Sequence, residues 1–149
     1  MKKRLTIIQM DVHVNDVEYN YNRVQELLSQ SLSESPDIIV LPETWNTGFY
    51  PSKELINIAD RNGERTKLLL STFVKEHNVN IVGGSVAVAK NDVVFNTSYA
   101  YNREGTLVGE YSKMHGFSPA KEDQYFAGGT HTTHFELDGI PCSTVICYD

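Results

Sequence analysis

Three side chains that could act in covalent catalysis each lie within two residues of the end of a strand-like run of the chain: Glu43, Lys113 and Cys147. The runs cover residues 38–41, 106–111 and 143–146. Each run has the composition of a β-strand, and open α/β sheets bind their ligands at the carboxyl ends of the strands. If the three strands lie side by side, a carboxylate, an ammonium and a thiol meet in one cleft.

Such a cluster would favour attack of a thiolate on a carbonyl carbon. A free thiol has a pKa of about 8.5, so it needs a partner that removes its proton near neutral pH. Glu43 is a candidate general base, and Lys113 would offset the repulsion between the carboxylate and the thiolate. The same lysine would stabilise the oxyanion that forms during the attack, a contribution of about 3 kcal/mol for one donor.

Taken one at a time, the same residues have ordinary structural explanations. A glutamate that follows Leu-Pro is commonly a solvated loop residue, and a lysine at a strand end is commonly exposed. Cys147 lies between Ile146 and Tyr148, where a cysteine usually packs in the core. A functional site therefore requires that the fold bring the three residues together.

The order of the apolar patterns predicts an α/β fold with a mixed sheet. Strands alternate with helices in the first half and follow one another in the second half, as in layered α/β proteins. We expect one helix that begins at Asn15 or Asp16 and ends in the Ser-rich loop 29–35, and a second helix over 64–77. The expected strands cover residues 5–10, 37–41, 81–88, 93–101, 106–111, 133–137 and 143–147. A hairpin turn is expected at 102–105 and a loop at 119–129.

Length and charge exclude several classes of function. The chain has 149 residues, enough for one domain with a core, and a net charge of −6. Its basic cluster is confined to residues 2–4, so neither a nucleic acid nor a membrane surface is an expected partner. The apolar run at 5–8 is too short for a secretory signal or a membrane span. We therefore expect a cytoplasmic protein whose two cysteines, Cys142 and Cys147, are reduced.

Three segments carry a resemblance to a known family. Leu-Pro-Glu-Thr at 41–44, Tyr-Ser-Lys-Met-His at 111–115 and Val-Ile-Cys-Tyr-Asp at 145–149 resemble the signature segments of the nitrilase superfamily, the carbon–nitrogen hydrolases. Their order and wide spacing match the family as well. Residues 81–85 and 95–97 resemble the strands between the signatures, so the resemblance spans almost the whole chain.

The resemblance implies an architecture and an assembly. The implied fold is α/β, the N-terminal portion of a four-layer α-β-β-α sandwich with mixed sheets. Because the family's domain is much longer than this chain, residues 1–149 are expected to be the N-terminal part of a single carbon–nitrogen hydrolase domain whose C-terminal part is absent from this chain. Members usually associate through a helical face, which implies a homo-oligomer, a dimer. No metal and no cofactor is implied, because the protein supplies every reacting group.

The resemblance also implies a role for each matching residue. Glu43 would be the general base, Lys113 the partner that steadies the tetrahedral intermediate, and Cys147 the nucleophile. The backbone N–H of Tyr148 would share the oxyanion hole with Lys113, and Glu122 matches a second glutamate that helps to position the substrate. The implied reaction forms a thioester with release of ammonia, and water activated by Glu43 then hydrolyses the thioester.

The segment 43–49 resembles the bacterial omega-amidase branch of the family, which hydrolyses the terminal amide of 2-oxo acids such as 2-oxoglutaramate. The aromatic and small residues of this loop are expected to wall a small polar substrate. A nitrile would demand the same three groups, so a nitrilase or another amidase of the superfamily stays open. The chain departs from the family at Gly116, where leucine is usual, and at 127–129, where glycine stands in place of an acidic residue.

Three other interpretations stay open on the sequence alone. Cys147 could pair with His115, His131 or His134 in a cysteine–histidine hydrolase. His131 and His134 could join Cys142 and Cys147 in a metal-binding module, although zinc sites favour more compact cysteine pairs. The third is a truncated, non-catalytic remnant of the fold, and a chain without a second half would be expected to aggregate or to be inactive.

Overall fold

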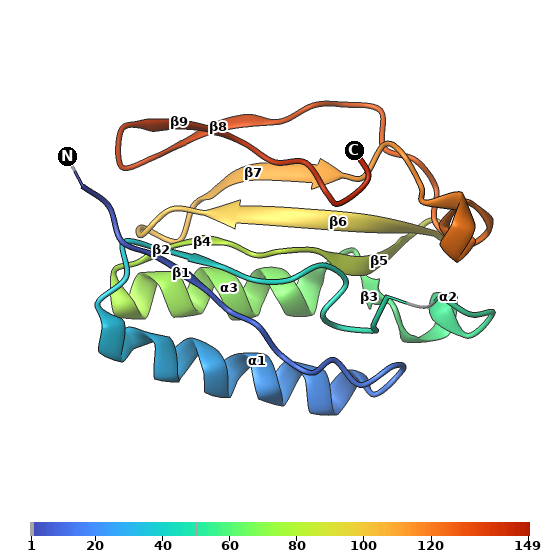
Figure 1. Ribbon diagram of the computed structural model, residues 1–149, viewed down its shortest axis with the longest axis horizontal. Helices are drawn as coiled ribbons and strands as arrows, with labels where there is room; N and C mark the ends of the chain where they lie inside the picture. Colours follow the sequence, from blue (N-terminus) through green and yellow to red (C-terminus); the bar gives the residue numbers. More distant parts are fainter. Residues whose placement is uncertain (1, 50) are drawn as a thin grey trace.

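The strands of the computed structural model, which describes residues 2–49 and 51–149, form one mixed sheet and one separate hairpin (Figure 1). Within these residues the seven strands of the sheet lie in the order β1-β2-β4-β6-β5-β3, and β7 pairs with the other edge of β6. β8 and β9 form the hairpin. The strands are β1 Leu5–Ile7, β2 Ile38–Val40, β3 Asp60–Arg61, β4 Asn80–Val82, β5 Val86–Lys90, β6 Val93–Tyr101, β7 Leu107–Ser112, β8 His134–Leu137 and β9 Ile140–Ser143.

The directions of the strands bring several carboxyl ends to the same edge of the sheet. β1, β2 and β4 are parallel, whereas β6 runs antiparallel to both β4 and β7. β7 therefore runs in the same direction as β2 and β4. Glu43, which follows β2, and Lys113, which follows β7, consequently lie at one edge. The predicted α/β class with a mixed sheet is confirmed.

Two helices cover one face of the sheet (Figure 1). α1 (Val17–Ser31) begins at Asp16, whose carboxylate accepts a hydrogen bond from the Tyr19 N–H at 3.1 Å and so satisfies a free donor of the first turn. α3 (Glu64–His77) ends at Asn78, whose left-handed backbone (φ 53°) closes the last turn. The predicted cap at Asp16 and the predicted helix 64–77 are confirmed. No helix in the described part of the chain is long and apolar enough to cross a membrane.

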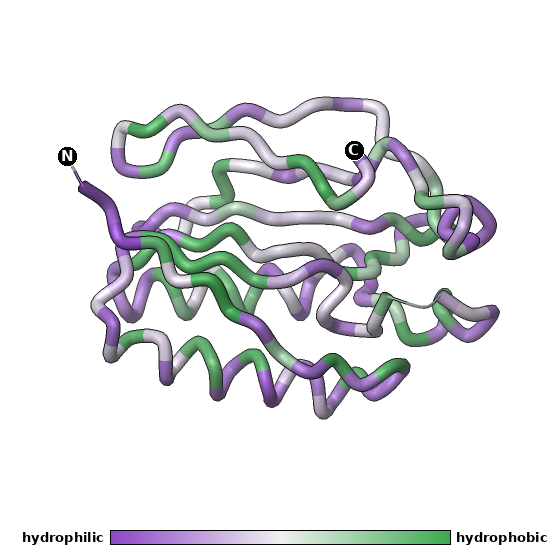
Figure 2. The backbone as a smooth tube through the Cα atoms, in the orientation of Figure 1, coloured by the Kyte–Doolittle hydropathy of each residue, from purple (hydrophilic) through white to green (hydrophobic). Residues whose placement is uncertain are grey.

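The main core lies between these helices and the sheet. Apolar side chains of α1 and α3 meet those of β2, β4 and β6, and the most deeply buried include Tyr21, Val24, Leu28, Ile39, Leu70, Val74, Ile81 and Tyr99. Figure 2 shows hydrophobic residues concentrated in β1, β2 and β4 and alternating with hydrophilic residues along α1. Burial of apolar surface, which contributes about 25 cal/mol per Å², is the main force that holds the helices on the sheet.

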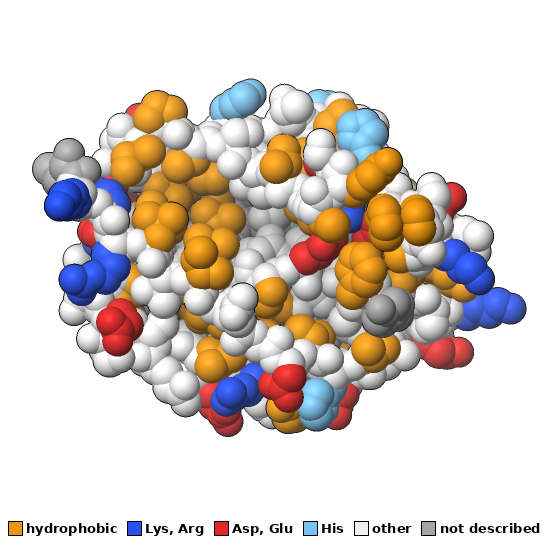
Figure 3. Space-filling model, viewed as in Figure 1, with side chains coloured by type: hydrophobic (Ala, Val, Ile, Leu, Met, Phe, Trp, Pro, Cys, Tyr) orange, Lys and Arg blue, Asp and Glu red, His pale blue; other side chains and the backbone are white. Residues whose placement is uncertain are grey.

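The opposite side of the sheet is covered less completely. The β8–β9 hairpin packs on β7 from this side (Figure 1). Phe135 on β8 lies so close to Gly109 on β7 that an added Cβ atom would be 2.6 Å from its ring. Leu5, Ile7 and Val145 remain 56%, 70% and 71% exposed. Figure 3 shows a hollow lined by hydrophobic side chains between the N-terminal strand and the hairpin.

Several boundaries differ from the sequence prediction. The expected strand 81–88 is two strands, β4 and β5, which pair with successive parts of β6 and are separated at residues 83–85. The expected strand 143–147 is wrong, because β9 ends at Ser143 and residues 144–147 pair with no strand within the described residues. β1 stops at Ile7, before residue 10. The Ser-rich stretch continues α1 to Ser31 before a 3₁₀ turn, so the expected loop is wrong there.

The sequence prediction also misses several short elements. α2 (Leu55–Ile58) and β3 lie in a region where no helix or strand was expected. Two 3₁₀ turns, Ser118–Ala120 and Glu122–Gln124, lie in the first half of the expected loop 119–129. Elements of two to four residues are too short to show a periodic apolar pattern.

Candidate active site

The loop that carries Glu43 is fastened to the segment between β4 and β5. The Ser85 N–H donates to the Pro42 carbonyl at 3.0 Å, and the Ser85 carbonyl accepts from the Trp45 N–H at 3.1 Å. The indole of Trp45 is fully buried and donates to the Gly83 carbonyl at 2.9 Å. These bonds hold the loop in one place. Trp45 packs in the core, so this aromatic residue of the loop does not wall a substrate.

Gly84 permits this close approach of the two segments. Its backbone is left-handed, with a φ of 58°, a region that glycine enters without steric cost. A Cβ atom at this position would lie 2.0 Å from the Pro42 carbonyl oxygen. The glycine pair inside the expected strand 81–88 therefore interrupts that strand and seats the loop of Glu43.

Lys113 is buried, contrary to the usual exposure of a lysine at a strand end. The residue is 4% exposed, and its backbone N–H donates to the Asn96 carbonyl on β6 at 2.9 Å. Its Nζ lies 3.0 Å from Glu43 Oε1 and 2.8 Å from Glu122 Oε2. The ammonium thus joins two carboxylates that come from different loops.

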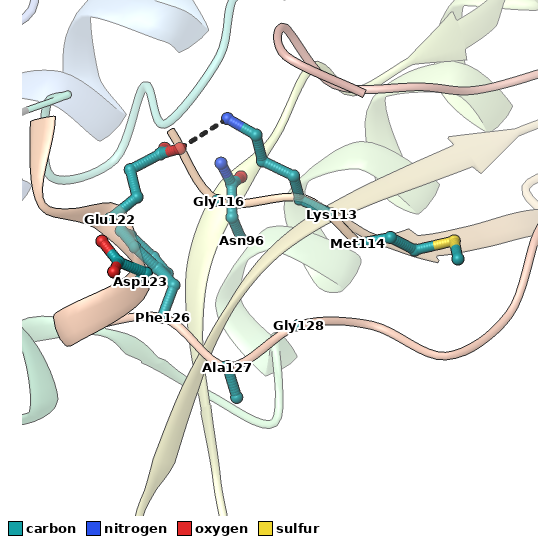
Figure 4. Close-up of a pocket in the computed structure, with 9 residues that line it drawn as sticks. All are labelled: Asn96, Lys113, Met114, Gly116, Glu122, Asp123, Phe126, Ala127 and Gly128. Atoms are coloured by element: carbon teal, nitrogen blue, oxygen red, sulfur yellow. Dashed lines mark hydrogen bonds and ion pairs between the residues drawn. The ribbon is translucent and has the colours of Figure 1, made fainter. Parts of the chain in front are cut away.

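Glu122 reaches Lys113 from the second 3₁₀ turn. The residue is 1% exposed, and its Oε2 also accepts the Phe117 N–H at 2.7 Å. Its other oxygen, Oε1, has no hydrogen-bond partner within residues 2–49 and 51–149. Figure 4 shows the side chains of Glu122, Lys113 and Asn96 reaching toward one another.

The charge of Lys113 follows from these contacts. Burial acts to lower the pKa of Lys113, but the hydrogen bonds and charges of Glu122 and Glu43 outweigh it and hold the pKa above its ordinary value. Lys113 is therefore an ammonium near neutral pH. Because two carboxylates face one ammonium, the cluster keeps a surplus of negative charge.

Asn96 is a polar contact that the sequence did not single out. It lies on β6, is 1% exposed, and its Nδ2 donates to Glu43 Oε1 at 3.0 Å. The only signal in the sequence was its place in the segment 95–97, which resembles a strand of the carbon–nitrogen hydrolases.

Cys147 lies on a turn and not at the end of a strand. Residues 147–148 form this turn, and the backbone of Cys147 is left-handed, with a φ of 49°. Such a conformation is uncommon for a residue with a side chain and is concentrated at functional sites. Cys147 is exposed, so the ordinary expectation of core packing is wrong. Tyr148 is 61% exposed, and its ring centroid lies 5.4 Å from that of Phe117.

The Cys147 thiol is influenced by the groups that meet at Lys113. Although the residue as a whole is exposed, partial shielding of the sulfur from water raises the pKa of the thiol. The charge of Glu43 raises this pKa further, and the charge of Lys113 lowers it, with a net value above the ordinary one. The sulfur therefore rests as a thiol near neutral pH, and Lys113 does not fully offset the carboxylates.

Asp149 connects the turn of Cys147 to the residues around Lys113. Its side chain is 4% exposed. It accepts hydrogen bonds of 2.7 to 3.1 Å from the hydroxyl of Tyr111 and from the N–H groups of Met114, His115 and Ile146. One carboxylate therefore fixes the turn of Cys147 relative to the end of β7. Asp149 lies in the signature segment 145–149, but the sequence assigned it no role.

Two small cavities lie at this cluster. One, of about 160 Å³, is lined by Glu43 and Cys147. The other, of about 200 Å³, is lined by Lys113, Glu122 and Asn96 (Figure 4). Glu43 lines the first cavity and Lys113 lines the second, and the ion pair between these two residues connects the cavities. The fold therefore brings together the carboxylate, ammonium and thiol that the sequence placed far apart.

The family of the chain follows from a comparison with known proteins. The family model described as carbon-nitrogen hydrolase matches residues 4–149. The chain belongs to the carbon–nitrogen hydrolase family. The family expected from the three signature segments is confirmed.

The relatives of this carbon–nitrogen hydrolase include amidases. It is 38% identical over 149 residues to the 2-oxoglutaramate amidase of Bacillus subtilis (strain 168). The aligned region covers 100% of this chain and 57% of the relative. It is 30% identical over 160 residues to the omega-amidase NIT2 of Danio rerio, over 99% of this chain and 55% of the relative. The chain therefore spans little more than half the length of these relatives.

A solved structure shares the fold of this carbon–nitrogen hydrolase. XC1258 from Xanthomonas campestris, a CN-hydrolase superfamily protein with an arsenic adduct in its active site, matches with a TM-score of 0.86 and 27% identity. The match covers 98% of this chain and 53% of that one. It agrees with the expected architecture, the N-terminal portion of the family's sandwich.

The cysteine–histidine and metal alternatives gain no support in this carbon–nitrogen hydrolase. Nδ1 of His115 lies 3.1 Å from Asp149, and Nδ1 of His131 lies 2.7 Å from the Thr130 hydroxyl. The groups that act on the Cys147 thiol are carboxylates and a lysine. Over the described ranges, no three His, Cys, Asp or Glu side chains are arranged to hold a metal ion.

Proposed function

We propose that this protein is an amidase that cleaves the carbon–nitrogen bond of a small non-peptide amide through a cysteine thioester. One observation carries the proposal: Lys113 Nζ lies 3.0 Å from Glu43, and Cys147 shares a cavity with the same glutamate. In this proposal residues 1–149 are the N-terminal part of a single carbon–nitrogen hydrolase domain.

In the first half-reaction, Glu43 removes the thiol proton while the sulfur of Cys147 attacks the carbonyl carbon of the amide. The bonds from Lys113 and Asn96 both end on Oε1 of Glu43, which leaves Oε2 to receive the proton. Lys113 and the backbone N–H of Tyr148 donate to the oxyanion. The carbon–nitrogen bond then breaks, the leaving nitrogen takes the proton from Glu43, and ammonia departs from the thioester.

In the second half-reaction, a water molecule attacks the thioester carbonyl. Glu43 takes a proton from the water, and the same donors stabilise the second oxyanion. The carbon–sulfur bond breaks, the sulfur of Cys147 regains the proton from Glu43, and the carboxylic acid leaves. The nucleophile, the base and the oxyanion donors are all protein groups, so the proposed reaction needs no metal and no cofactor.

We assign Glu122 a part in holding the substrate. Its Oε2 is engaged by Lys113 and by the Phe117 N–H, but the buried Oε1 lacks a partner among the described residues. A buried acceptor without a partner costs about 1–3 kcal/mol. An N–H group of the substrate amide would satisfy this oxygen and orient the carbonyl toward Cys147.

The substrate class we propose is the terminal amide of a small 2-oxo acid, with 2-oxoglutaramate as the first candidate. The similarity to the 2-oxoglutaramate amidase of Bacillus subtilis supports this choice. Cavities of about 160 and 200 Å³ suit a small substrate. A nitrilase is the alternative, because a nitrile would use the same groups, and the amidase names of the relatives favour the amide.

The oligomeric state and the cellular location of the protein are also proposals. Assembly into a homodimer and a cytoplasmic location stay predictions, which sedimentation and cell fractionation can test.

The proposed function is tested by measuring ammonia release by the full-length protein. We expect release from 2-oxoglutaramate, less from a neutral terminal amide, and none from the matching nitrile. Mass spectrometry of quenched reactions is expected to find an acyl group on Cys147. Cys147→Ala should abolish turnover, whereas Cys142→Ala, which changes the other cysteine, should leave it intact. Unchanged turnover in Cys147→Ala would exclude the thioester mechanism.

A further inference from the structure

We propose that Asn96 is a positioning residue that holds the carboxylate of Glu43 in its working orientation. The inference rests on the proposed function, because it assigns Glu43 the role of general base. Asn96 comes from the middle of the sheet and Glu43 from a loop, and the two residues are 53 positions apart in the chain.

The hydrogen bond between them accounts for a side chain that is otherwise out of place. Asn96 is 1% exposed on β6, and asparagine is disfavoured in strands. Its Nδ2 donates to Glu43 Oε1 at 3.0 Å, whereas its Oδ1 has no partner within the described residues. The bond to Glu43 is therefore the contact that can explain a buried amide at this position.

The orientation of the amide is determined by its partner. An ionised carboxylate only accepts hydrogen bonds, so the nitrogen of Asn96, and not its oxygen, must face Glu43. Asn96 and Lys113 bind the same oxygen of Glu43, each at 3.0 Å. Two donors on Oε1 restrain the carboxylate, and neither engages Oε2, while Glu43 lines the same cavity as Cys147.

A neutral donor suits this position because of the charges around it. Glu43 and Glu122 share the single ammonium of Lys113. A carboxylate in place of Asn96 would add a like charge about 3 Å from Glu43 and repel it. An amide holds Glu43 without changing the charge of the cluster.

The backbone of Asn96 has a separate task. Its carbonyl accepts the Lys113 N–H at 2.9 Å, and this bond survives any substitution of the side chain. Side-chain variants of Asn96 therefore test the contact to Glu43 without releasing Lys113 from β6.

The test compares turnover of 2-oxoglutaramate, or of whichever amide the full-length protein hydrolyses, in Asn96→Ala, Asn96→Asp and Glu43→Gln. Asn96→Ala is expected to lower kcat by about 100-fold, the usual cost of misplacing a catalytic group by an ångström, with little change in KM. Asn96→Asp fills the same space but cannot donate, so it should lose at least as much. Thr97→Val, which removes a neighbouring buried hydroxyl that bonds Ser112, is the matched control and should keep its kcat.

The double variant distinguishes positioning from a general structural defect. If Asn96 acts through Glu43, adding Asn96→Ala to Glu43→Gln should cause no further loss of kcat. An equal loss in both backgrounds, or wild-type kcat in a folded Asn96→Ala, would overturn the inference. Full turnover in Glu43→Gln would instead reject the proposed function, because the base itself would then be dispensable. Thermal melting of each variant identifies any that fails to fold. If Asn96→Ala fails to fold, Asn96→Asp takes its place in the comparison.

Discussion

At the scale of single residues, the chemistry of the site depends on how charge is shared around Lys113. Its ammonium bonds Glu43 and Glu122, and these contacts hold its pKa above the ordinary value despite burial. The surplus negative charge acts on Cys147, whose pKa is raised by partial shielding and by Glu43. The proposed nucleophile therefore rests in its protonated form, and the proposed mechanism needs a general base in each turnover.

The first prediction concerns the pKa of Cys147. Glu43→Gln should lower this pKa, because it removes a negative charge that disfavours the thiolate. Lys113→Met should raise it further, because the ammonium is the group that favours the thiolate. The rate of alkylation by iodoacetamide as a function of pH, in a Cys142→Ala background, measures both shifts. A rise of the midpoint in Glu43→Gln would contradict the charge arrangement described above.

At the scale of elements, the site is held by contacts between loops and not by the strands themselves. The loop after β2 is fastened to the break between β4 and β5 through Ser85 and Gly84. The turn of Cys147 is fastened to the end of β7 through Asp149. Each connection positions one catalytic candidate, so damage to either should reduce activity before it disrupts the core.

Gly84→Ala tests the first connection. A Cβ atom there would be 2.0 Å from the Pro42 oxygen, and the backbone is left-handed. We expect a loss of about 1–3 kcal/mol in the free energy of unfolding and a marked fall in kcat as the loop of Glu43 shifts. Gly139→Ala is the control, because Gly139 also has a positive φ (79°) but no atom within 4 Å of an added Cβ. Urea unfolding and ammonia release measure the two effects, and equal results for both variants would rule out the steric explanation.

The second connection predicts a dependence of stability on pH. Burial acts to raise the pKa of Asp149, but the donors around it, Tyr111 first, outweigh this and hold the pKa below its ordinary 3.8. Because the folded pKa is the lower one, the stabilisation is fully present above the unfolded value and is lost as pH falls through the folded value. Asp149→Asn should therefore lower the free energy of unfolding at neutral pH.

The difference between Asp149→Asn and the wild type should shrink as pH falls below about 4, where the carboxylate of the unfolded chain becomes protonated. It should close once pH falls below the lower pKa of the folded carboxylate. Urea titrations across this range provide the measurement. A difference that stays constant into acid would show that the charge of Asp149 is not what stabilises the turn.

Local patterns were sufficient for the elements that are long and amphipathic. The helix 64–77 and the strand 93–101 coincide with α3 and β6, because each spans enough residues for its period to be clear. The apolar run at 143–147 was misread, because Val145 and Ile146 have strand-forming side chains but pair with no strand in the described part of the chain. Strand pairing is decided by distant segments, which a local pattern does not contain.

The residues of the site also divide into those that a local segment of sequence can predict and those that depend on distant contacts. Glu43, Lys113 and Cys147 could be predicted because each lies in a recognisable segment of the chain. Asn96 and Asp149 also lie in segments that resemble the family, but their contacts could not be predicted, because these are hydrogen bonds to residues 53 and 34 to 38 positions away. A contact of this kind leaves no trace in the spacing of residues along the sequence.

At the scale of the whole molecule, one side of the sheet carries the helices and the other carries exposed apolar side chains. Leu5, Ile7 and Val145 are more than half exposed, and Val145 also lines the cavity of Cys147. Exposed apolar patches of this kind mark surfaces that are covered by another part of a protein or by a partner. The proposal that residues 1–149 are part of a larger domain would account for this face.

The corresponding prediction is that residues 1–149, produced alone, bind a hydrophobic dye and associate as their concentration rises. Ile7→Lys should weaken both effects, because Ile7 is 70% exposed on the uncovered side. Ile56→Lys, at an exposed apolar position on α2, should change them little. Dye fluorescence and light scattering provide the readouts. Equal effects of the two lysines would mean that no particular face is responsible.

The left-handed backbone of Cys147 makes stability and the proposed activity favour different residues at this position. A side chain in this conformation costs about 1 kcal/mol relative to glycine. A library of variants selected only for survival at high temperature should thus enrich glycine or asparagine at position 147 and discard the enzyme's sulfur. By the same reasoning, Cys147→Gly is a better choice than alanine when an inert, well-folded protein is wanted for trapping a bound amide.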